Sequence, residues 1–479
     1  MSYYASIGAV RIQTWIAQSA SKLALVRGAS VLLSSKTANS AVSEWLAKHH
    51  RTVRVAEDAG DVDGVVVLVS NDKAALRAAT EALLAKLDSD IPGLQWEAWI
   101  AEGGSYLQAY ESHGDKAADY RSLPPLTELG LARTCDFCGV EPAIGPLKEW
   151  EKDGQAGPSC LARKAARDKE EARARNTHDE FWNEIPGSWP REFESLAVFG
   201  GTHQGATEQE AVGRTDSRSH LATVAADGNG IGALFRMIAQ AKLPRLRADA
   251  VRLLNEATRS AVTEAAKACG TDVSTMAVIP HYVGGDDVFV SVAAPSAWRF
   301  AVTLGEQFEE LRTHLAARVT DDIEGAEGLR AAIGSLGLGI GVAFARRAVP
   351  ISGTSEAAHA ALAAAKASTR GGASAIGWVD LTFAADKIHT VEVSSASGEL
   401  SKVVPNDVFK LGPSARGSLT DLVRSAPADL GDAVAKWAKR TGNTVSAAAV
   451  PHLPATLSRA RWWPDLPDED IDEETKEAS

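Results

Sequence analysis

The sequence contains little cysteine, no long apolar run and no excess of positive charge. Four cysteines in 479 residues are too few for the disulfide framework of a small secreted scaffold. No run of about 18 apolar residues occurs, so a membrane span is not expected. The N-terminus, MSYYASIGAVRIQTW, lacks the basic segment and apolar core of a secretion signal. These absences predict a cytoplasmic protein that does not contact a membrane.

The charge balance excludes one class of nucleic-acid protein. A formal net charge of -12 argues against a protein that coats nucleic acid by charge alone. It leaves room for a local basic groove, or for RNA held by partner subunits. Part of the negative charge lies in the last segment, DLPDEDIDEETKEAS, whose composition is typical of a solvated, disordered end.

The hydrophobic patterning predicts two blocks with one order of elements. In the first block we expect strands at residues 2–8, 52–56, 62–69 and 94–101 and helices at 11–25, 28–49 and 72–87. In the second we expect strands at residues 220–226, 277–283, 288–293, 336–344 and 375–383 and helices at 229–241, 246–269, 296–317 and 355–368. Both begin β-α-α-β-β-α-β, which is a ferredoxin-like sandwich with one long crossover, and the second block continues with a further α-β pair.

The predicted fold class is therefore α+β, with two ferredoxin-like (palm) domains. A cysteine-bearing insertion separates them, and a helical region that includes a helix at 416–440 follows. The predicted boundaries are 1–128 for the first domain, 129–192 for the insertion and helical linker, 193–398 for the second domain and 399–479 for the C-terminal region.

The most informative motif is the hairpin HYVGGDDVFVSVA at residues 281–293. Gly284 and Gly285 permit a tight turn and a close approach of backbone to a phosphate. Asp286 and Asp287 follow, and adjacent strand residues point to opposite faces. We therefore expect Asp286 to bind metal directly and Asp287 to assist.

A further carboxylate is expected from ATVAADGNGIGALF at residues 222–235. An apolar strand there ends in Asp227, and Gly228 and Asn229 lead into a helix whose N-terminus offers N–H groups to phosphates. In a ferredoxin-like sheet this strand lies beside the hairpin. Asp227 and Asp286 would then hold two Mg²⁺ or Mn²⁺ ions about 3.5–4 Å apart. Taken singly, the hairpin could be a structural turn and Asp227 a helix cap; the combination favours a site.

These residues resemble the large subunit of type III CRISPR effector complexes, the Cmr/Csm family of palm polymerase-cyclases. The family's G-G-D-D hairpin is matched by 284–287, and its strand ending in a D-G-D/N turn by 227–229. The patterns S-I-G-x-V-x-x-x-x-W-I and R-G-A-S-x-L-L-S, at 6–16 and 27–34, resemble its first palm. The segment CDFCGVEPA…GPSCLARK resembles its cysteine insertion.

The resemblance implies an enzyme that converts ATP to cyclic oligoadenylate, an antiviral second messenger, when target RNA is bound. It implies partners as well: crRNA-binding and small helical subunits, with crRNA and target RNA reached through the complex. Asp227, Asp286 and Asp287 would be catalytic, and Gly228, Asn229, Gly284 and Gly285 would bind nucleotide. Related diguanylate cyclases use a lysine on a late helix, and Lys366 stands at the comparable place, although a lysine near a helix end is often only solvated.

The differences between this sequence and the family pattern lead to further predictions. Many members begin with an HD nuclease domain, whereas the resemblance here starts at the first palm, so we expect no HD-type DNase activity. The first palm has no G-G-D-D equivalent and is expected to be catalytically degenerate. Two alternatives stay open: an inactive palm scaffold of an RNA-guided complex, which Asn229 in place of a second acid favours, and a stand-alone signalling cyclase.

The cysteine segment predicts a metal site with an incomplete ligand set. Cys135 and Cys138 form a C-x-x-C pair, but the residue paired with Cys160 would be Gly157, and zinc ribbons use four ligands. Either a structural zinc takes a fourth ligand from elsewhere, or the site has decayed. Neither makes the segment catalytic.

Three further features have a functional and a structural interpretation. His281 could contact a base or pack on the strand face. His203 belongs to a Gly/Thr-containing loop, 200–219, that could cover a site or merely connect elements. Trp462 and Trp463 could anchor a partner or pack in the core.

Overall fold

A computed structural model describes most of the chain. The described residues are 2–18, 23–114, 116–122, 133–149, 152–174, 193, 196–197, 220–269, 278–323, 325–382, 387–400, 408, 411, 413–425, 429–460 and 462. No helix among them is both long and apolar enough to cross a bilayer.

The first sheet has five strands in the order β2-β3-β1-β4-β5. Its strands are β1 (Ser2–Val10), β2 (Arg54–Val55), β3 (Val65–Ser70), β4 (Gln95–Gly103) and β5 (Tyr120–Arg121). The helices of this half are α1 (Ile12–Ala17), α2 (Leu23–Thr37), α3 (Asn39–His49), α4 (Lys73–Asp90) and α5 (Tyr106–His113), with a short turn of 3-10 helix, η1 (Glu57–Ala59). The strand β1 lies antiparallel between β3 and β4, as the ferredoxin-like prediction requires.

The second sheet has six strands in the order β13-β12-β11-β8-β10-β9. Its strands are β8 (His220–Asn229), β9 (Val278–Gly284), β10 (Asp287–Ala293), β11 (Gly337–Arg346), β12 (Ala375–Asp380) and β13 (His389–Glu392). The helices are α10 (Ile231–Gln240), α11 (Pro244–Ala268), α12 (Ala297–Ala316), α13 (Ala326–Gly334), α14 (Ile351–Thr369) and α15 (Val393–Leu400), with a 3-10 turn η3 (Ala294–Ser296). The order β11-β8-β10-β9 is again ferredoxin-like, so the predicted α+β class with two palm-type sheets is confirmed.

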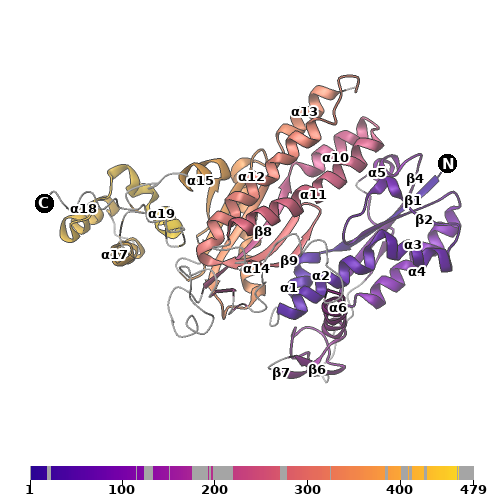
Figure 1. The fold of residues 1–479 in the computed structure, drawn as a ribbon, viewed down its shortest axis with the longest axis horizontal. Helices are drawn as coiled ribbons and strands as arrows, with labels where there is room; N and C mark the ends of the chain where they lie inside the picture. Colours follow the sequence, from indigo (N-terminus) through magenta and orange to yellow (C-terminus); the bar gives the residue numbers. More distant parts are fainter. Residues whose placement is uncertain are drawn as a thin grey trace.

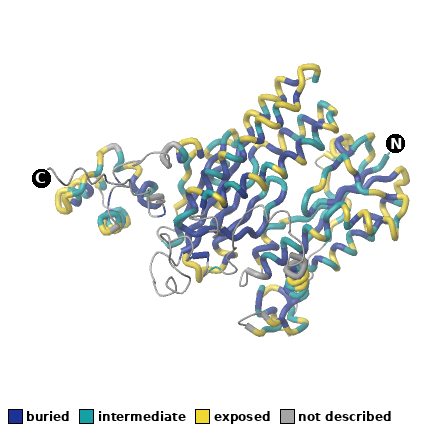
Figure 2. Tube along the Cα trace, in the orientation of Figure 1, coloured by how far each residue is buried: buried dark blue, intermediate teal, exposed yellow. Residues whose placement is uncertain are grey.

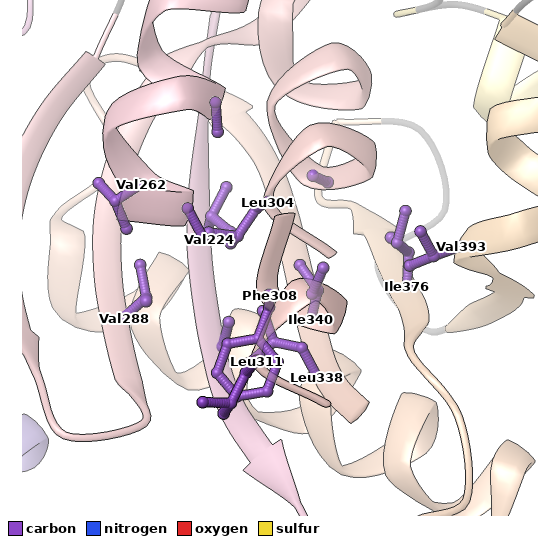
Figure 3. Packing of buried hydrophobic residues seen from close by; sticks show 14 of the residues in the cluster. Val224, Val262, Val288, Leu304, Phe308, Leu311, Leu338, Ile340, Ile376 and Val393 are labelled. Atoms are coloured by element: carbon purple, nitrogen blue, oxygen red, sulfur yellow. The ribbon is translucent and has the colours of Figure 1, made fainter. Parts of the chain in front are cut away.

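The core of the second palm lies between its sheet and the helices α11 and α12. Figure 3 shows Val224 and Val288 from neighbouring strands beside Leu304 and Phe308 from α12. These side chains are at most 1% exposed, and burying each contributes about 1.5–3 kcal/mol. The apolar residues of β8 and β10 thus fix the strands that carry the acidic ends.

The helix α14 covers the opposite face of this sheet unusually closely. A Cβ atom at Gly341 of β11 would lie 1.9 Å from the backbone oxygen of Ala358, and one at Gly377 of β12 would lie 2.1 Å from that of Ala361. Only glycine allows this approach. Because α14 lies so close to the sheet, side chains on its sheet-facing side can contact the strands beneath it.

The cysteine segment docks against the first palm. It consists of a hairpin, β6 (Gly145–Glu149) and β7 (Lys152–Ala156), followed by α6 (Pro158–Ala174). The helix α6 lies along α2 (Figure 1). A Cβ at Gly28 of α2 would be 2.1 Å from the backbone oxygen of Arg163, so glycine is needed here too.

The C-terminal region is helical as predicted, but the single helix expected at 416–440 is wrong. Two helices occupy this stretch, α17 (Pro413–Arg424) and α18 (Leu430–Thr441), followed by η4 (Ala447–His452) and α19 (Leu453–Ala460). Asp429 caps α18 by accepting from the N–H of Asp432. Pro427 lies between the two helices in the sequence, and proline interrupts a helix because it lacks the N–H donor.

Trp462 packs in the core of the second palm. It is 3% exposed, its ring stacks on Phe344 at 5.5 Å, and its indole N–H donates to Asp380 at 2.8 Å. Figure 2 shows the buried sheets beneath helices whose outer faces are exposed. Of the two interpretations of Trp462, core packing is the one that the structure supports.

Candidate active site

The acidic hairpin forms a two-residue turn between β9 and β10. Gly284 pairs with Asp287, and Gly285 and Asp286 lie between them. Gly285 has a φ of +61°, the left-handed conformation that the first central residue of a type II′ turn needs. The turn therefore presents Asp286 at its tip and Asp287 at the start of β10.

The structure brings the carboxylates of Asp227 and Asp286 together. The strand β8 pairs with β10 through Ala226 and Val288, so Asp227, the residue after Ala226, lies beside the start of β10 and the hairpin turn. Asp227 lies close enough to Asp286 for its charge to raise the pKa of the Asp286 carboxyl. A Cβ at Gly228 would lie 2.7 Å from Oδ2 of Asp286, so glycine at 228 makes room for this carboxylate.

Burial and neighbouring negative charge disfavour the ionised forms of Asp286 and Asp287. Burial, followed by the nearby charge of Asp227, raises the pKa of Asp286 to about 7. The same two causes, with the charge of Asp286 added, raise the pKa of Asp287 to about 7. A cluster of carboxylates whose ionised forms are disfavoured is stabilised by a bound cation.

Lys366 lies in this cluster. Its ammonium donates to Oδ2 of Asp227 and to the backbone oxygen of Gly228, the latter at 3.3 Å. The close packing of α14 accounts for this reach, since Cγ of Lys366 passes over Gly339 of β11, where a Cβ would lie only 2.7 Å away. Lys366 thus contacts Asp227 instead of being only solvated.

A residue from the first palm also enters the site, which the sequence did not predict. The amide nitrogen of Gln13, on α1, donates to Oδ1 of Asp287 at 3.0 Å. Its amide oxygen contacts Nε2 of His359, on α14. The other ring nitrogen of His359 lies 2.7 Å from the backbone oxygen of Ser355.

The remaining predicted nucleotide-binding residues occupy different surroundings. Asn229 is 3% exposed, and its amide nitrogen donates to the backbone oxygen of Ala373 at 3.1 Å. The strand β8 continues through Asn229, which pairs with Gly337, so only Gly230 forms the turn into α10. Gly284 is also tightly enclosed, since a Cβ there would lie 2.8 Å from the hydroxyl of Tyr282.

The donor set fits divalent metal ions. Carboxylate oxygens are the ligands that Mg²⁺ prefers, and Asp227 and Asp286 offer theirs from two strands at one sheet edge. A cation bound between these two carboxylates would reduce the repulsion between their negative charges. Asp227 and Asp286 are therefore the residues that would hold metal.

The three cysteines of the insertion converge. The Sγ atoms of Cys135, Cys138 and Cys160 all lie within 4.8 Å of one another. The N–H groups of Phe137 and Cys138 point to Sγ of Cys135 at 3.4 and 3.5 Å. A hydrogen bond to Cys160 lowers the pKa of Cys138 to about 5, which favours a thiolate. The cluster is compatible with zinc.

The surroundings of the three cysteines exclude several candidates for a fourth zinc ligand. A Cβ at Gly157 would lie 2.6 Å from Oε2 of Glu141, so this position has no room for a cysteine. Glu141 itself accepts from the N–H and hydroxyl of Ser159 at 3.0 and 2.7 Å. Cys269 is buried in the second palm, with Sγ 3.5 Å from the backbone oxygen of Ser296. Among the described residues, neither Glu141 nor Cys269 joins the cluster.

Of the remaining residues singled out in the sequence, the structure describes His281. His281 is 2% exposed and its Nε2 lies 2.7 Å from the hydroxyl of Ser291; burial lowers its pKa to about 3. It packs on the strand face rather than contacting a base. His203 and Trp463 lie outside the described residues.

Comparisons with known proteins agree with this architecture. The family model of the second palm domain of Cas10/Cmr2 matches residues 220–374. The solved structure of Csm1 in T. onnurineus is similar over 96% of this chain and 69% of that chain, with 14% identity and a TM-score of 0.54. A Csm1–Csm4 cassette in complex with cA4 is similar over the same shares, with 13% identity and a TM-score of 0.52.

A third solved structure extends this likeness. The Csm1–Csm4 subcomplex of a type III-A CRISPR-Csm interference complex has 14% identity and a TM-score of 0.52, again over 96% of this chain and 69% of that chain. At such identities the likeness shows the fold. No curated protein matches the sequence at a significant level.

Proposed function

We propose that this chain is a Cas10/Csm1-like large subunit of a type III effector complex and that it joins ATP molecules into cyclic oligoadenylate; the match of residues 220–374 to the family model of the second palm domain of Cas10/Cmr2 supports this. The observation that carries this proposal is the meeting of Asp227 and Asp286 at one sheet edge, with Asp287 and Lys366 beside them. A merely structural turn does not require this concentration of partly buried charge.

Each residue has a part in the proposed reaction. Asp227 and Asp286 would hold Mg²⁺ or Mn²⁺, with Asp287 assisting. The metal, when bound, would supply a lowered pKa of an attacking 3′-hydroxyl and stabilisation of the leaving pyrophosphate. Lys366 balances the charge of Asp227 before nucleotide binds and is placed to contact a phosphate afterwards. The N-terminus of α10 offers N–H groups to the same triphosphate.

The proposed setting is a complex of the type III kind. The solved relatives include Csm1–Csm4 cassettes in complex with cA4 and with one ATP, which supports ATP as the substrate and a second subunit as a partner; we propose a crRNA-binding subunit in that place. Small helical subunits, crRNA and target RNA would be reached through that assembly. An inactive scaffold is the competing function, and Asn229, buried and bonded to Ala373, offers no additional acid to the site.

The test is product formation from labelled ATP by the purified assembly with Mg²⁺ or Mn²⁺ and target RNA. We expect oligoadenylate from the unaltered chain and none from Asp286→Ala plus Asp287→Ala, with assembly unchanged. The matched control is Asp321→Ala plus Asp322→Ala, an exposed pair on the same palm, which should keep full activity. Activity that survives loss of the first pair would refute the site, and no product from the unaltered chain under any metal and RNA condition would favour the scaffold.

A further inference from the structure

The helix α1 of the first palm reaches the acidic hairpin of the second. Gln13 is 274 positions from Asp287 in the sequence and 346 from His359, yet its amide group lies between the two. Its nitrogen donates to Asp287 and its oxygen contacts the ring of His359. When Asp287 is ionised this amide orientation is fixed, because a carboxylate only accepts hydrogen bonds.

The position of Gln13 is built into the fold at both ends of its helix. Arg11, the residue before α1, has a left-handed φ of 56°, which is costly for a residue with a Cβ. At the other end Arg163 of α6 donates to the backbone oxygen of Trp15 at 2.7 Å and to that of Ile16 at 3.4 Å. These are carbonyls of the last turn, which have no partner within the helix.

Arg163 also stacks on Trp15, with its guanidinium 4.1 Å from the ring, and it is fully buried. The indole of Trp15 donates to the backbone oxygen of Pro92 at 3.2 Å. A helix of six residues is too short to be stable by itself. The surrounding contacts therefore hold α1 in the place that presents Gln13.

The position of His359 is fixed by the packing of its helix on the sheet. The helix α14 that carries it is pressed onto the sheet through Gly341, where Ala358 leaves no room for a Cβ. The same helix carries Lys366, two turns further on. One helix thus contacts the cluster at two points, at Asp227 through Lys366 and at Asp287 through Gln13.

We propose that Gln13 is a positioning residue of the nucleotidyl transfer site, which orients Asp287 by bridging it to His359 and thereby makes the site depend on the docking of the two palms. The inference rests on the proposed function. It changes the role of the first palm: although it lacks an acidic pair of its own, it contributes a side chain to the site of the second palm.

The experiment compares Gln13→Leu, which leaves an apolar side chain that can neither donate nor accept a hydrogen bond, with Gln18→Leu. Gln18 ends the same helix and is exposed, so its variant should behave as the unaltered chain. In the assembly with target RNA, loss of a hydrogen bond to a charged group should lower kcat by about tenfold. The KM for ATP should stay within about twofold, because orientation rather than binding is lost.

A spectroscopic arm separates positioning from a general structural effect. In protein labelled at histidine ring nitrogens, the His359 signals are assigned by their loss in His359→Ala. The Nε2 signal should move in Gln13→Leu and stay in Gln18→Leu, without nucleotide or metal. Adding His359→Ala to Gln13→Leu should cost little more than either change alone, because the two residues act through one bridge.

The outcomes are distinguishable. An unmoved Nε2 signal, or a kcat for Gln13→Leu within twofold of the unaltered chain, overturns the inference and leaves the proposed function intact. If the unaltered chain makes no product, the proposed function fails, and the Nε2 signal alone decides whether Gln13 bridges the two groups.

Discussion

Replacing the hairpin carboxylates by amides should stabilise the metal-free protein, and the gain should depend on pH. In Asp286→Asn plus Asp287→Asn the shape of the site is kept and its repulsion is removed. The pKa of each carboxyl is raised from 3.8 to about 7. Between these values the folded protein binds more protons than the unfolded chain, so the stability of the unaltered protein falls as pH rises through this window and levels off above it.

The magnitude follows from the pKa values. One pKa unit corresponds to about 1.4 kcal/mol, so a shift from 3.8 to about 7 costs each ionised carboxylate at most about 4.5 kcal/mol. Both side chains are partly exposed and share one repulsion with Asp227, which reduces the cost of the pair to roughly 2–4 kcal/mol. For a unit of 150–250 residues this corresponds to a rise in Tm of about 4–16 °C at pH 8, shrinking toward pH 4.

The assay is thermal unfolding in chelator across this pH range, followed by the same scan with Mg²⁺. The surface pair Asp321→Asn plus Asp322→Asn is the control, and its Tm should shift little at any pH because both residues are exposed. Mg²⁺ should raise the Tm of the unaltered protein at pH 8 and leave that of the hairpin variant unchanged. A Tm difference that is constant with pH, or a hairpin variant that is less stable at pH 8, would refute the reasoning.

Two further changes test the packing and the cysteine cluster. Gly341→Ala should destabilise the second palm by about 1–3 kcal/mol or more, measured by denaturant unfolding, because the new Cβ meets the backbone oxygen of Ala358 at 1.9 Å; unchanged stability would show that α14 is not pressed onto the sheet. Metal analysis should find zinc in the unaltered protein and in Cys269→Ser but not in Cys135→Ser; equal zinc content in the Cys135→Ser and unaltered proteins would contradict the predicted zinc site.

The architecture was predictable because its signals are local. Apolar strands bounded by glycine and acidic turns mark both sheets, and a ferredoxin-like order alone places the end of β8 beside the β9–β10 hairpin. The proximity of Asp227 and Asp286 followed from that order. The position of Lys366 on α14 was also expected, although its pairing with Asp227 depends on how closely three glycines let the helix approach.

The contacts that the sequence did not reveal join distant parts of the chain. Nothing in the pattern of α1 distinguishes Gln13 from a solvated polar residue, since its partners lie on β10 and α14. Arg163 likewise reads as one more charge on a basic helix, yet it is buried against Trp15. Residues at a contact between two domains follow no periodic pattern in the sequence, so the roles of Gln13 and Arg163 could be identified only from the structure. The break between α17 and α18 is different, because Pro427 marks it in the sequence.

The central claim is that carboxylates from two separate stretches of chain share metal ions. It is tested most directly by crystals grown with Mn²⁺ and a non-hydrolysable ATP analogue, in which anomalous scattering locates the metal. The account predicts two peaks about 3.5–4 Å apart, each ligated by Asp227, Asp286 or both. Metal bound to the nucleotide alone, with no carboxylate of β8 or of the hairpin as a ligand, would contradict it.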